Sequence, residues 1–196
     1  MNRTNKIVKK IVLIGLLTEL ATAFSFVKIP IAGTATVNLV LPVVVIGAIL
    51  CGPEVGAWLT IIPTLTTFGE ASLFLQYSPA GAVLTLFLKG ILAGLAAGIA
   101  YEALAEKHPK GAVLCAAVIT PIVNSGVFVL GCYVFIWGEL VALAAEANVG
   151  IGALLLGLAG INFVVELIIN IVLCPSIIRI IRLASKKENA DKSDKQ

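Results

Sequence analysis

The chain has 196 residues, of which 59% are hydrophobic and 13% charged, and its mean hydropathy is +1.06. Soluble domains carry about 25% charged residues, so this composition excludes an ordinary water-soluble domain and indicates a surface that faces lipid. The net charge of +3 is small and localised, which argues against nucleic acid as a partner.

Six apolar segments are predicted to cross the membrane as helices, because a hydrocarbon core about 30 Å thick needs long apolar stretches. The first covers about 6–27, behind a basic tail. A loop at 28–36, broken by Pro30 and Gly33, precedes the second segment at about 37–50. The third follows the Cys51–Glu54 turn and reaches about Phe68. After a loop at 69–79 come the fourth, fifth and sixth segments, at about 80–104, 112–136 and 150–183.

Two further predictions complete the domain organisation. Residues 137–148 are expected to form a short interfacial helix. Residues 1–184 are then one domain, an all-α integral membrane protein built as a compact bundle of about six transmembrane helices. The charged residues 185–196 are expected to be a disordered cytoplasmic tail.

The positions of Lys and Arg predict the orientation. Four lie in the N-terminal tail, two in the turn after the fourth segment and six at the C-terminal end, and an even number of crossings places these regions on one side. Only Lys28 lies on the opposite side, and Lys89 is inside a segment. By the positive-inside rule both termini are cytoplasmic, in a multi-pass protein of a prokaryotic plasma membrane.

Polar side chains inside the apolar segments are functional candidates, since an ionisable group in lipid is costly unless it faces protein, water or a ligand. Asn162, Glu166 and Asn170 recur every four residues and therefore share one helix face. Lys89 lies in the fourth segment and Asn124 in the fifth. These positions suggest a polar pocket in which Lys89 meets an anionic ligand. Two alternatives stay open: the groups only join helices by hydrogen bonds, or Lys89 pairs with Glu166.

Small residues at a spacing of four let helices approach closely. Gly90, Gly94 and Gly98 are expected to serve packing within the bundle. In the first segment small residues recur around Glu19, where internal packing and a docking face for another membrane subunit are equally favoured; these residues are Gly15, Thr18, Thr22 and Ser25.

No sequence pattern indicates catalysis. The chain has no Walker motif, no Ser/His/Asp set, no metal-ligand cluster and no dinucleotide-binding loop. The four cysteines are widely separated, and the single His108 lies in a polar turn. We therefore expect a protein that is not an enzyme, with no cofactor and no metal.

Four features together resemble the S-component, the substrate-binding subunit of energy-coupling factor vitamin transporters that include folate, riboflavin and pantothenate binders. The first is the size and the six-segment layout. The others are an ordered set of apolar, glycine-based motifs that extend over nearly the whole chain: Phe26–Ile31 leading into Asn38–Pro42, then Ile46–Ala57, and Ser78–Gly81 followed by Phe87–Gly98.

The resemblance implies a small vitamin-like substrate held in the outer half of the bundle. It also implies a transmembrane T-subunit and two cytoplasmic ATPases, which would power import by toppling the S-component in the lipid bilayer. Carried onto this chain, the substrate-binding positions are Lys28, Thr34, Thr36, Asn38, Gln76, Tyr77, Lys89, Asn124, Asn162 and Glu166. The Ala-x-x-x-Ala docking motif frequent in the family is missing, and Gly15, Thr18, Thr22 and Ser25 would replace it.

Competing functions remain open at this level. A self-sufficient secondary transporter or channel would predict ion coupling and internal repeats, and no convincing repeat is found. An intramembrane enzyme lacks a catalytic constellation. Among substrates, Lys89 favours an anionic vitamin such as pantothenate, with folate, riboflavin and pyridoxine-like molecules as alternatives. If Lys89 pairs with Glu166, the argument for an anion disappears.

Overall fold

The computed structural model describes residues 3–32, 35–66, 68 and 72–193. Helices dominate this part of the chain, which confirms the all-α fold class. In chain order the elements are α1 (Arg3–Phe26), β1 (Lys28–Ala32), β2 (Ala35–Asn38), α2 (Val40–Cys51), α3 (Pro53–Thr66), α4 (Ser72–Tyr77), α5 (Pro79–Ala105), α6 (Pro109–Phe135), α7 (Trp137–Glu146), α8 (Ile151–Leu155), the π-helix η2 (Leu156–Gly160) and α9 (Ile161–Ser193).

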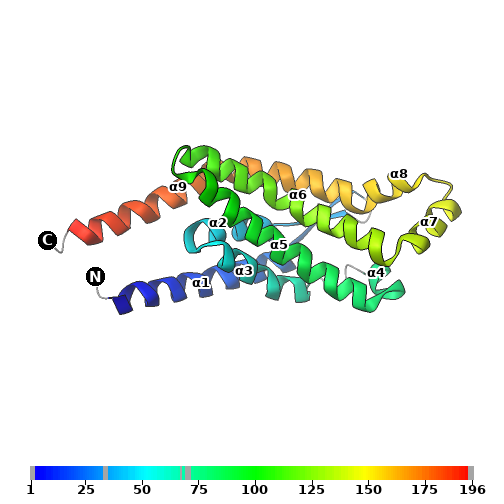
Figure 1. Ribbon diagram of the computed structural model, residues 1–196, viewed down its shortest axis with the longest axis horizontal. Coiled ribbons are helices and arrows are strands. Elements are labelled where there is room, and N and C mark those ends of the chain that lie inside the picture. Colours follow the sequence, from blue (N-terminus) through cyan, green and yellow to red (C-terminus); the bar gives the residue numbers. More distant parts are fainter. Residues whose placement is uncertain (1–2, 33–34, 67, 69–71, 194–196) are drawn as a thin grey trace.

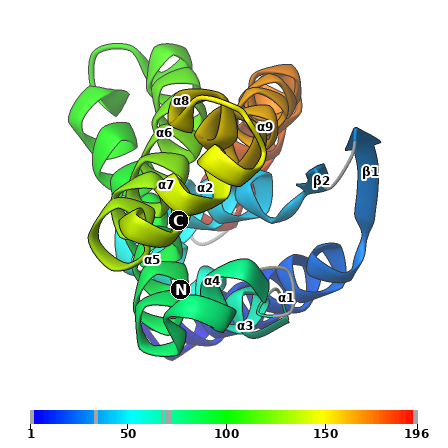
Figure 2. The ribbon, with the colours of Figure 1, turned by 90° about the vertical axis from the view of Figure 1, so that its right-hand side faces the viewer.

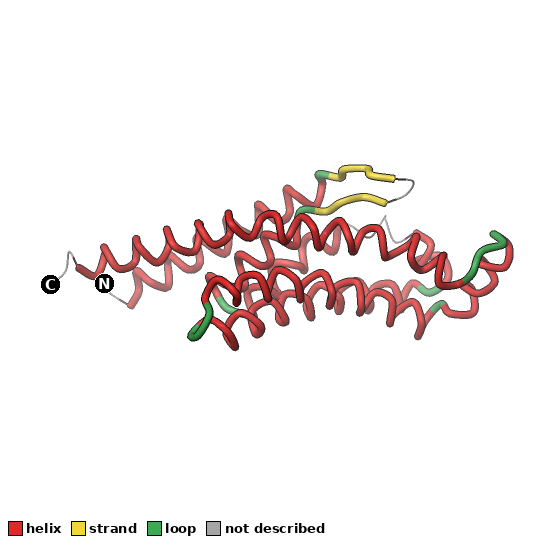
Figure 3. Tube along the Cα trace, turned by 90° about the horizontal axis from the view of Figure 1, so that it is seen from above, coloured by secondary structure: helices red, strands yellow, loops and turns green. Residues whose placement is uncertain are grey.

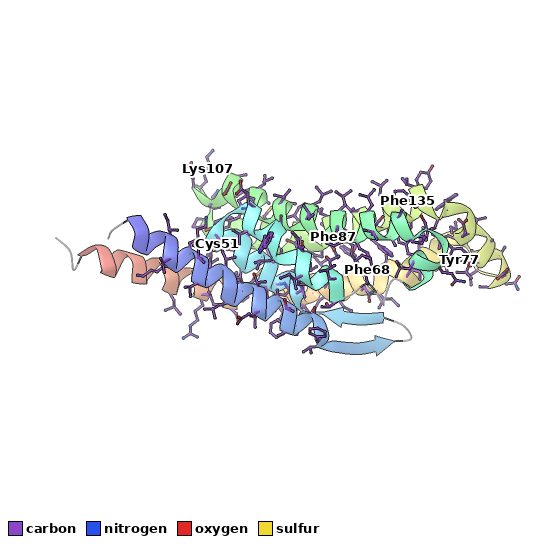
Figure 4. The ribbon with its side chains drawn as sticks, turned by 90° about the horizontal axis from the view of Figure 1, so that it is seen from below. Cys51, Phe68, Tyr77, Phe87, Lys107 and Phe135 are labelled. Atoms are coloured by element: carbon purple, nitrogen blue, oxygen red, sulfur yellow. The ribbon has the colours of Figure 1, made fainter. Side chains whose placement is uncertain are left out.

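The helices form an elongated bundle with both chain ends at the same end (Figure 1). The turn between α5 and α6, which contains Lys107, also lies at that end, whereas Tyr77 and Phe135 lie at the opposite one (Figure 4). We call these the basic end and the distal end. The short helices α4, α7 and α8 gather at the distal end (Figure 2).

Three helical segments among the described residues are long and apolar enough to span a membrane: Pro79–Ala105, Pro109–Phe135 and Ile151–Ile181. By contrast, α2 has 12 residues and α3 has 14. At 1.5 Å per residue they measure about 18 and 21 Å, less than a hydrocarbon core of about 30 Å. The six crossings expected from the sequence therefore stay a prediction.

Glycines of α5 set its distance from α3. A Cβ on Gly94 would collide with the Gly56 backbone, and one on Gly98 would lie 2.5 Å from Pro53 Cα. At Gly90 the nearest atom is Thr60 Cβ, at 2.9 Å. The spacing of four residues thus serves packing within the bundle, as the sequence predicts.

Apolar residues fill the bundle in three clusters. One joins α1, α2 and α3 around Leu59, which is fully buried. The second joins α2, α5, α6 and α9, where alanines such as Ala97 and Ala116 bring the helices close. The third lies at the distal end, around Phe74 and Leu140. Long helices are thereby held on both sides of the region where the polar residues lie.

The chain after α1 differs from the loop that Pro30 and Gly33 predict. Strands β1 and β2 pair antiparallel, with Lys28 opposite Asn38 and Pro30 opposite Thr36. The hairpin stands beside the helices rather than among them (Figures 2 and 3). As a result α2 begins at Val40, three residues later than expected.

Two other segments are more helical than expected. Part of the predicted 69–79 loop is helix α4. Helix α9 continues to Ser193, through most of the segment for which the sequence predicts disorder. The short helix expected over 137–148 is found as α7, and its interfacial position stays a prediction.

Candidate functional site

Polar side chains from α5, α6 and α9 meet inside the bundle. Asn124 Nδ2 on α6 donates a hydrogen bond to the Glu166 carboxylate on α9, at 3.4 Å. The Lys89 ammonium on α5 attracts the same carboxylate. It also lies 5.3 Å from the centre of the Phe128 ring on α6. We call Lys89, Asn124, Phe128 and Glu166 the polar cluster.

The charges of the polar cluster compensate each other. A lysine over an aromatic face is attracted by the ring quadrupole, and a carboxylate is stabilised by an amide donor and a nearby cation. One positive and one negative group give the cluster a formal charge of zero. In this arrangement Lys89 is not an isolated cation, which weakens the argument for an anionic ligand.

Three buried oxygens around the polar cluster have no hydrogen-bond partner among the described residues: Asn162 Oδ1, Asn170 Oδ1 and Thr85 Oγ1. Asn170 nevertheless donates from its Nδ2 to the Glu166 backbone carbonyl, at 3.0 Å. An unsatisfied buried polar group costs about 1–3 kcal/mol. A ligand that brings N–H or O–H donors to Asn162, one turn from Glu166, would therefore gain binding energy there.

The helix that carries Asn162 and Glu166 is irregular just before them. Leu156–Gly160 forms a π-helix, and Asn162 follows two residues after its end. Such segments widen one turn, shift the direction of the side chains that follow, and occur often at functional sites. The sequence pattern does not indicate this segment, nor does it single out Phe128 and Thr85. The close spacing of Gly157 and Gly160 is the one sequence feature that could have indicated the π-helix.

The predicted loop residues are not all brought to the polar cluster. Gln76 and Tyr77 are exposed on α4, and Tyr77 lies at the distal end (Figure 4). The backbones of Lys28, Thr36 and Asn38 belong to the hairpin. Thr34 lies outside the described residues. The structure thus brings together Lys89, Asn124 and Glu166, with Asn162 one turn away.

The four small residues of α1 differ in their surroundings. A Cβ on Gly15 would meet no described atom within 4 Å. Thr18 and Thr22 are half-buried and donate to backbone carbonyls of their own helix. Ser25 is buried and accepts a hydrogen bond from Thr66 Oγ1 of α3, at 2.7 Å. Ser25 therefore joins α1 to α3, and Gly15 is the open position.

The described residues contain no group of three His, Cys, Asp or Glu side chains that could hold a metal ion. The cysteines are free thiols, and Cys51, Cys132 and Cys174 are buried. What the arrangement offers chemically is a charge pair, amide groups and an aromatic face, which can bind and orient a small polar molecule.

Comparison with known families identifies the chain. The family model described as "ECF transporter, substrate-specific component" matches residues 9–178, which is most of the sequence and includes every residue of the polar cluster. No curated protein and no solved structure gives a match. The chain therefore belongs to the family of substrate-specific components of ECF transporters.

Proposed function

We propose that this substrate-specific component captures a small vitamin or vitamin precursor for ATP-driven uptake with a T-subunit and two cytoplasmic ATPases. The observation that carries the proposal is the convergence of Lys89, Asn124 and Glu166 from three helices, with the unpartnered Asn162 oxygen beside them. Polar groups at this depth are expensive in lipid and are retained mainly where a function needs them.

The proposed orientation places the basic end in the cytoplasm of a prokaryotic cell, with six crossings. The two chain ends and the turn with Lys107 lie at that end (Figures 1 and 4). These regions hold twelve of the fourteen Lys and Arg residues of the chain, which the positive-inside rule assigns to the cytoplasmic side. Substrate would enter from the distal end, under α4, α7 and the hairpin.

The proposed substrate carries no net charge, either as a neutral or as a zwitterionic molecule. The Glu166 carboxylate, which Lys89 attracts, adds a negative charge to the site, so an anion such as pantothenate would give it an excess negative charge. A neutral ligand with hydrogen-bond donors can use the Asn162 oxygen and the Phe128 ring without disturbing the charge pair.

Thermal unfolding of the detergent-purified protein against a panel of neutral, zwitterionic and anionic vitamins tests the function and the substrate class. A ligand at 100 times its Kd should stabilise the protein by about 2.7 kcal/mol. We expect a rise in Tm with a vitamin that has no net charge. A folded protein whose Tm responds to no member of the panel would contradict a vitamin-binding function.

Changing the charge of the polar cluster should change the ligand preference. Glu166→Gln keeps the shape of the side chain but leaves Lys89 without its carboxylate partner, so affinity for anionic vitamins should increase relative to neutral ones. Glu19→Gln is the matched control, because Glu19 is exposed on α1. If both variants keep the wild-type preference, the polar cluster does not contact the substrate.

Docking of a T-subunit on α1 is proposed at Gly15, Thr18 and Thr22. Gly15→Leu adds a side chain where no described atom lies within 4 Å, so the variant should fold and bind vitamin normally. We expect it to lose co-purification with the T-subunit and ATPases. Gly126→Leu on α6 is the control, since Gly126 is equally open. Normal complex formation by Gly15→Leu would exclude this part of α1 as the docking surface. Vitamin uptake by cells without a T-subunit would instead support a self-sufficient transporter.

A further inference from the structure

A groove on the side of the bundle belongs to none of the sites above. It runs between α1, α2 and α9, with a volume of about 500 Å³. Leu20 and Phe24 of α1 form one wall, Pro42 and Val43 of α2 the floor, and Val172 lies in the opposite wall. Figure 1 shows α2 lying between the other two helices. Of the lining residues only Ser176 is polar.

The length of the groove indicates what kind of molecule can bind in it. Its α9 wall runs from Ile168 to Ile180. At 1.5 Å per residue this wall is about 18 Å long, comparable to one leaflet of a hydrocarbon core about 30 Å thick. An extended alkyl chain of one leaflet therefore matches the groove in length and in apolar chemistry.

The walls of the groove open sideways. Val172 is 67% exposed and Leu20 41% exposed, whereas Val43 in the floor is 2% exposed. An occupant can therefore enter from the lipid without passing through the bundle. A polar vitamin gains nothing here, because Ser176 is the single polar side chain in the lining.

Basic residues flank one end of the groove. Arg179 is exposed, and it lies two turns beyond Val172 on the same face of α9. Lys9 is exposed on α1, three turns before the lining residue Leu20. Lys9 and Arg179 both lie near the same end of α2. Lys10, next to Lys9, interacts electrostatically with Cys51 at the end of α2, and Ile177, beside Arg179, packs in the cluster that contains Ala48.

We propose that this groove binds one acyl chain of an anionic phospholipid, with its phosphate group between Arg179 and Lys9. The apolar walls match the chain in chemistry and length. The two basic residues at the mouth match a negatively charged headgroup, as basic pockets beside transmembrane helices commonly do. This lipid site is separate from the polar cluster and does not depend on the identity of the vitamin.

Native mass spectrometry of the full-length protein with phosphatidylglycerol or phosphatidylcholine tests the proposal. We expect one tightly retained phosphatidylglycerol, favoured over phosphatidylcholine by about fivefold or more, as one or two basic residues can provide. Arg179→Gln should weaken this preference and Lys9→Gln combined with Arg179→Gln should abolish it, whereas Lys107→Gln, which changes another exposed cation at the basic end, should keep it.

A second variant tests the acyl-chain position. Ser176→Phe fills the groove from an exposed position and should reduce retained lipid by about fivefold or more. Leu130→Phe, on the exposed face of α6, is the control and should retain lipid normally. Equal retention of both lipids by the wild type, or undiminished retention by Ser176→Phe, would overturn the proposal. So would a Ser176→Phe variant that loses the T-subunit while keeping its lipid, because the groove would then be a subunit contact.

Discussion

A Gly94→Ala variant is expected to be among the least stable single substitutions in this protein, although it adds only one methyl group. That methyl would collide with the Gly56 backbone and lie 2.6 Å from Ala57 N, so α5 and α3 must move apart. Overpacking of this kind costs about 1–3 kcal/mol, or roughly 3–10 °C in Tm for a protein of this size. Thermal unfolding in detergent measures the effect.

The control variant is expected to change stability in the opposite direction. Gly15→Ala makes the same change where no described atom lies within 4 Å. Alanine favours a helix over glycine by about 1 kcal/mol, so this variant should be as stable as the wild type or more stable. A Gly94→Ala variant with wild-type Tm would show that α3 and α5 do not pack through Gly56 and Gly94.

The second large effect is expected at the polar cluster. Lys89→Met removes the cation that attracts the half-buried Glu166 carboxylate, which should cost about 1–3 kcal/mol because the carboxyl group can take up a proton instead. Adding Glu166→Gln removes the uncompensated charge and should restore about half of the lost stability. Thermal unfolding of the wild type, both single variants and the double variant completes the cycle.

A surface charge provides the reference for this cycle. Lys107→Met changes an exposed lysine in the turn between α5 and α6 and should alter stability by less than about 0.5 kcal/mol. If the losses from Lys89→Met and Glu166→Gln simply add, the two side chains do not interact. The substrate class would then return to an anion bound by Lys89.

Residue spacing predicted the parts of the structure that depend on a single helix. Gly90, Gly94 and Gly98 share a face because they are four residues apart, and that face does pack against α3. Glu166, one turn from Asn162 and from Asn170, likewise meets Asn124 of α6. Composition alone was sufficient to predict the all-α membrane class, because a long apolar segment in lipid must satisfy its backbone hydrogen bonds internally, as a helix does.

The remaining features depend on contacts or backbone geometry that spacing does not encode. Whether Lys89 meets a ligand or Glu166 is decided by how α5 and α9 sit across α6, and these residues are far apart in sequence. The hairpin was missed because Pro30 interrupts the alternating pattern by which strands are recognised. The π-helix was missed because its Leu, Gly and Ala residues are equally compatible with a regular helix.

The short helices α2 and α3 have a consequence for the surrounding membrane. With 12 and 14 residues they are about half as long as α5 and α6, which have 27 each. A hydrocarbon core about 30 Å thick, which the long helices can span, exceeds the short pair by about 10 Å, and each Å of such mismatch costs a fraction of a kcal/mol. Lipids beside α2 and α3 must therefore thin, or the whole molecule must lean towards that side. The protein is consequently asymmetric in hydrophobic height, and we expect its tilt to respond to bilayer thickness more than that of a bundle with six equal helices.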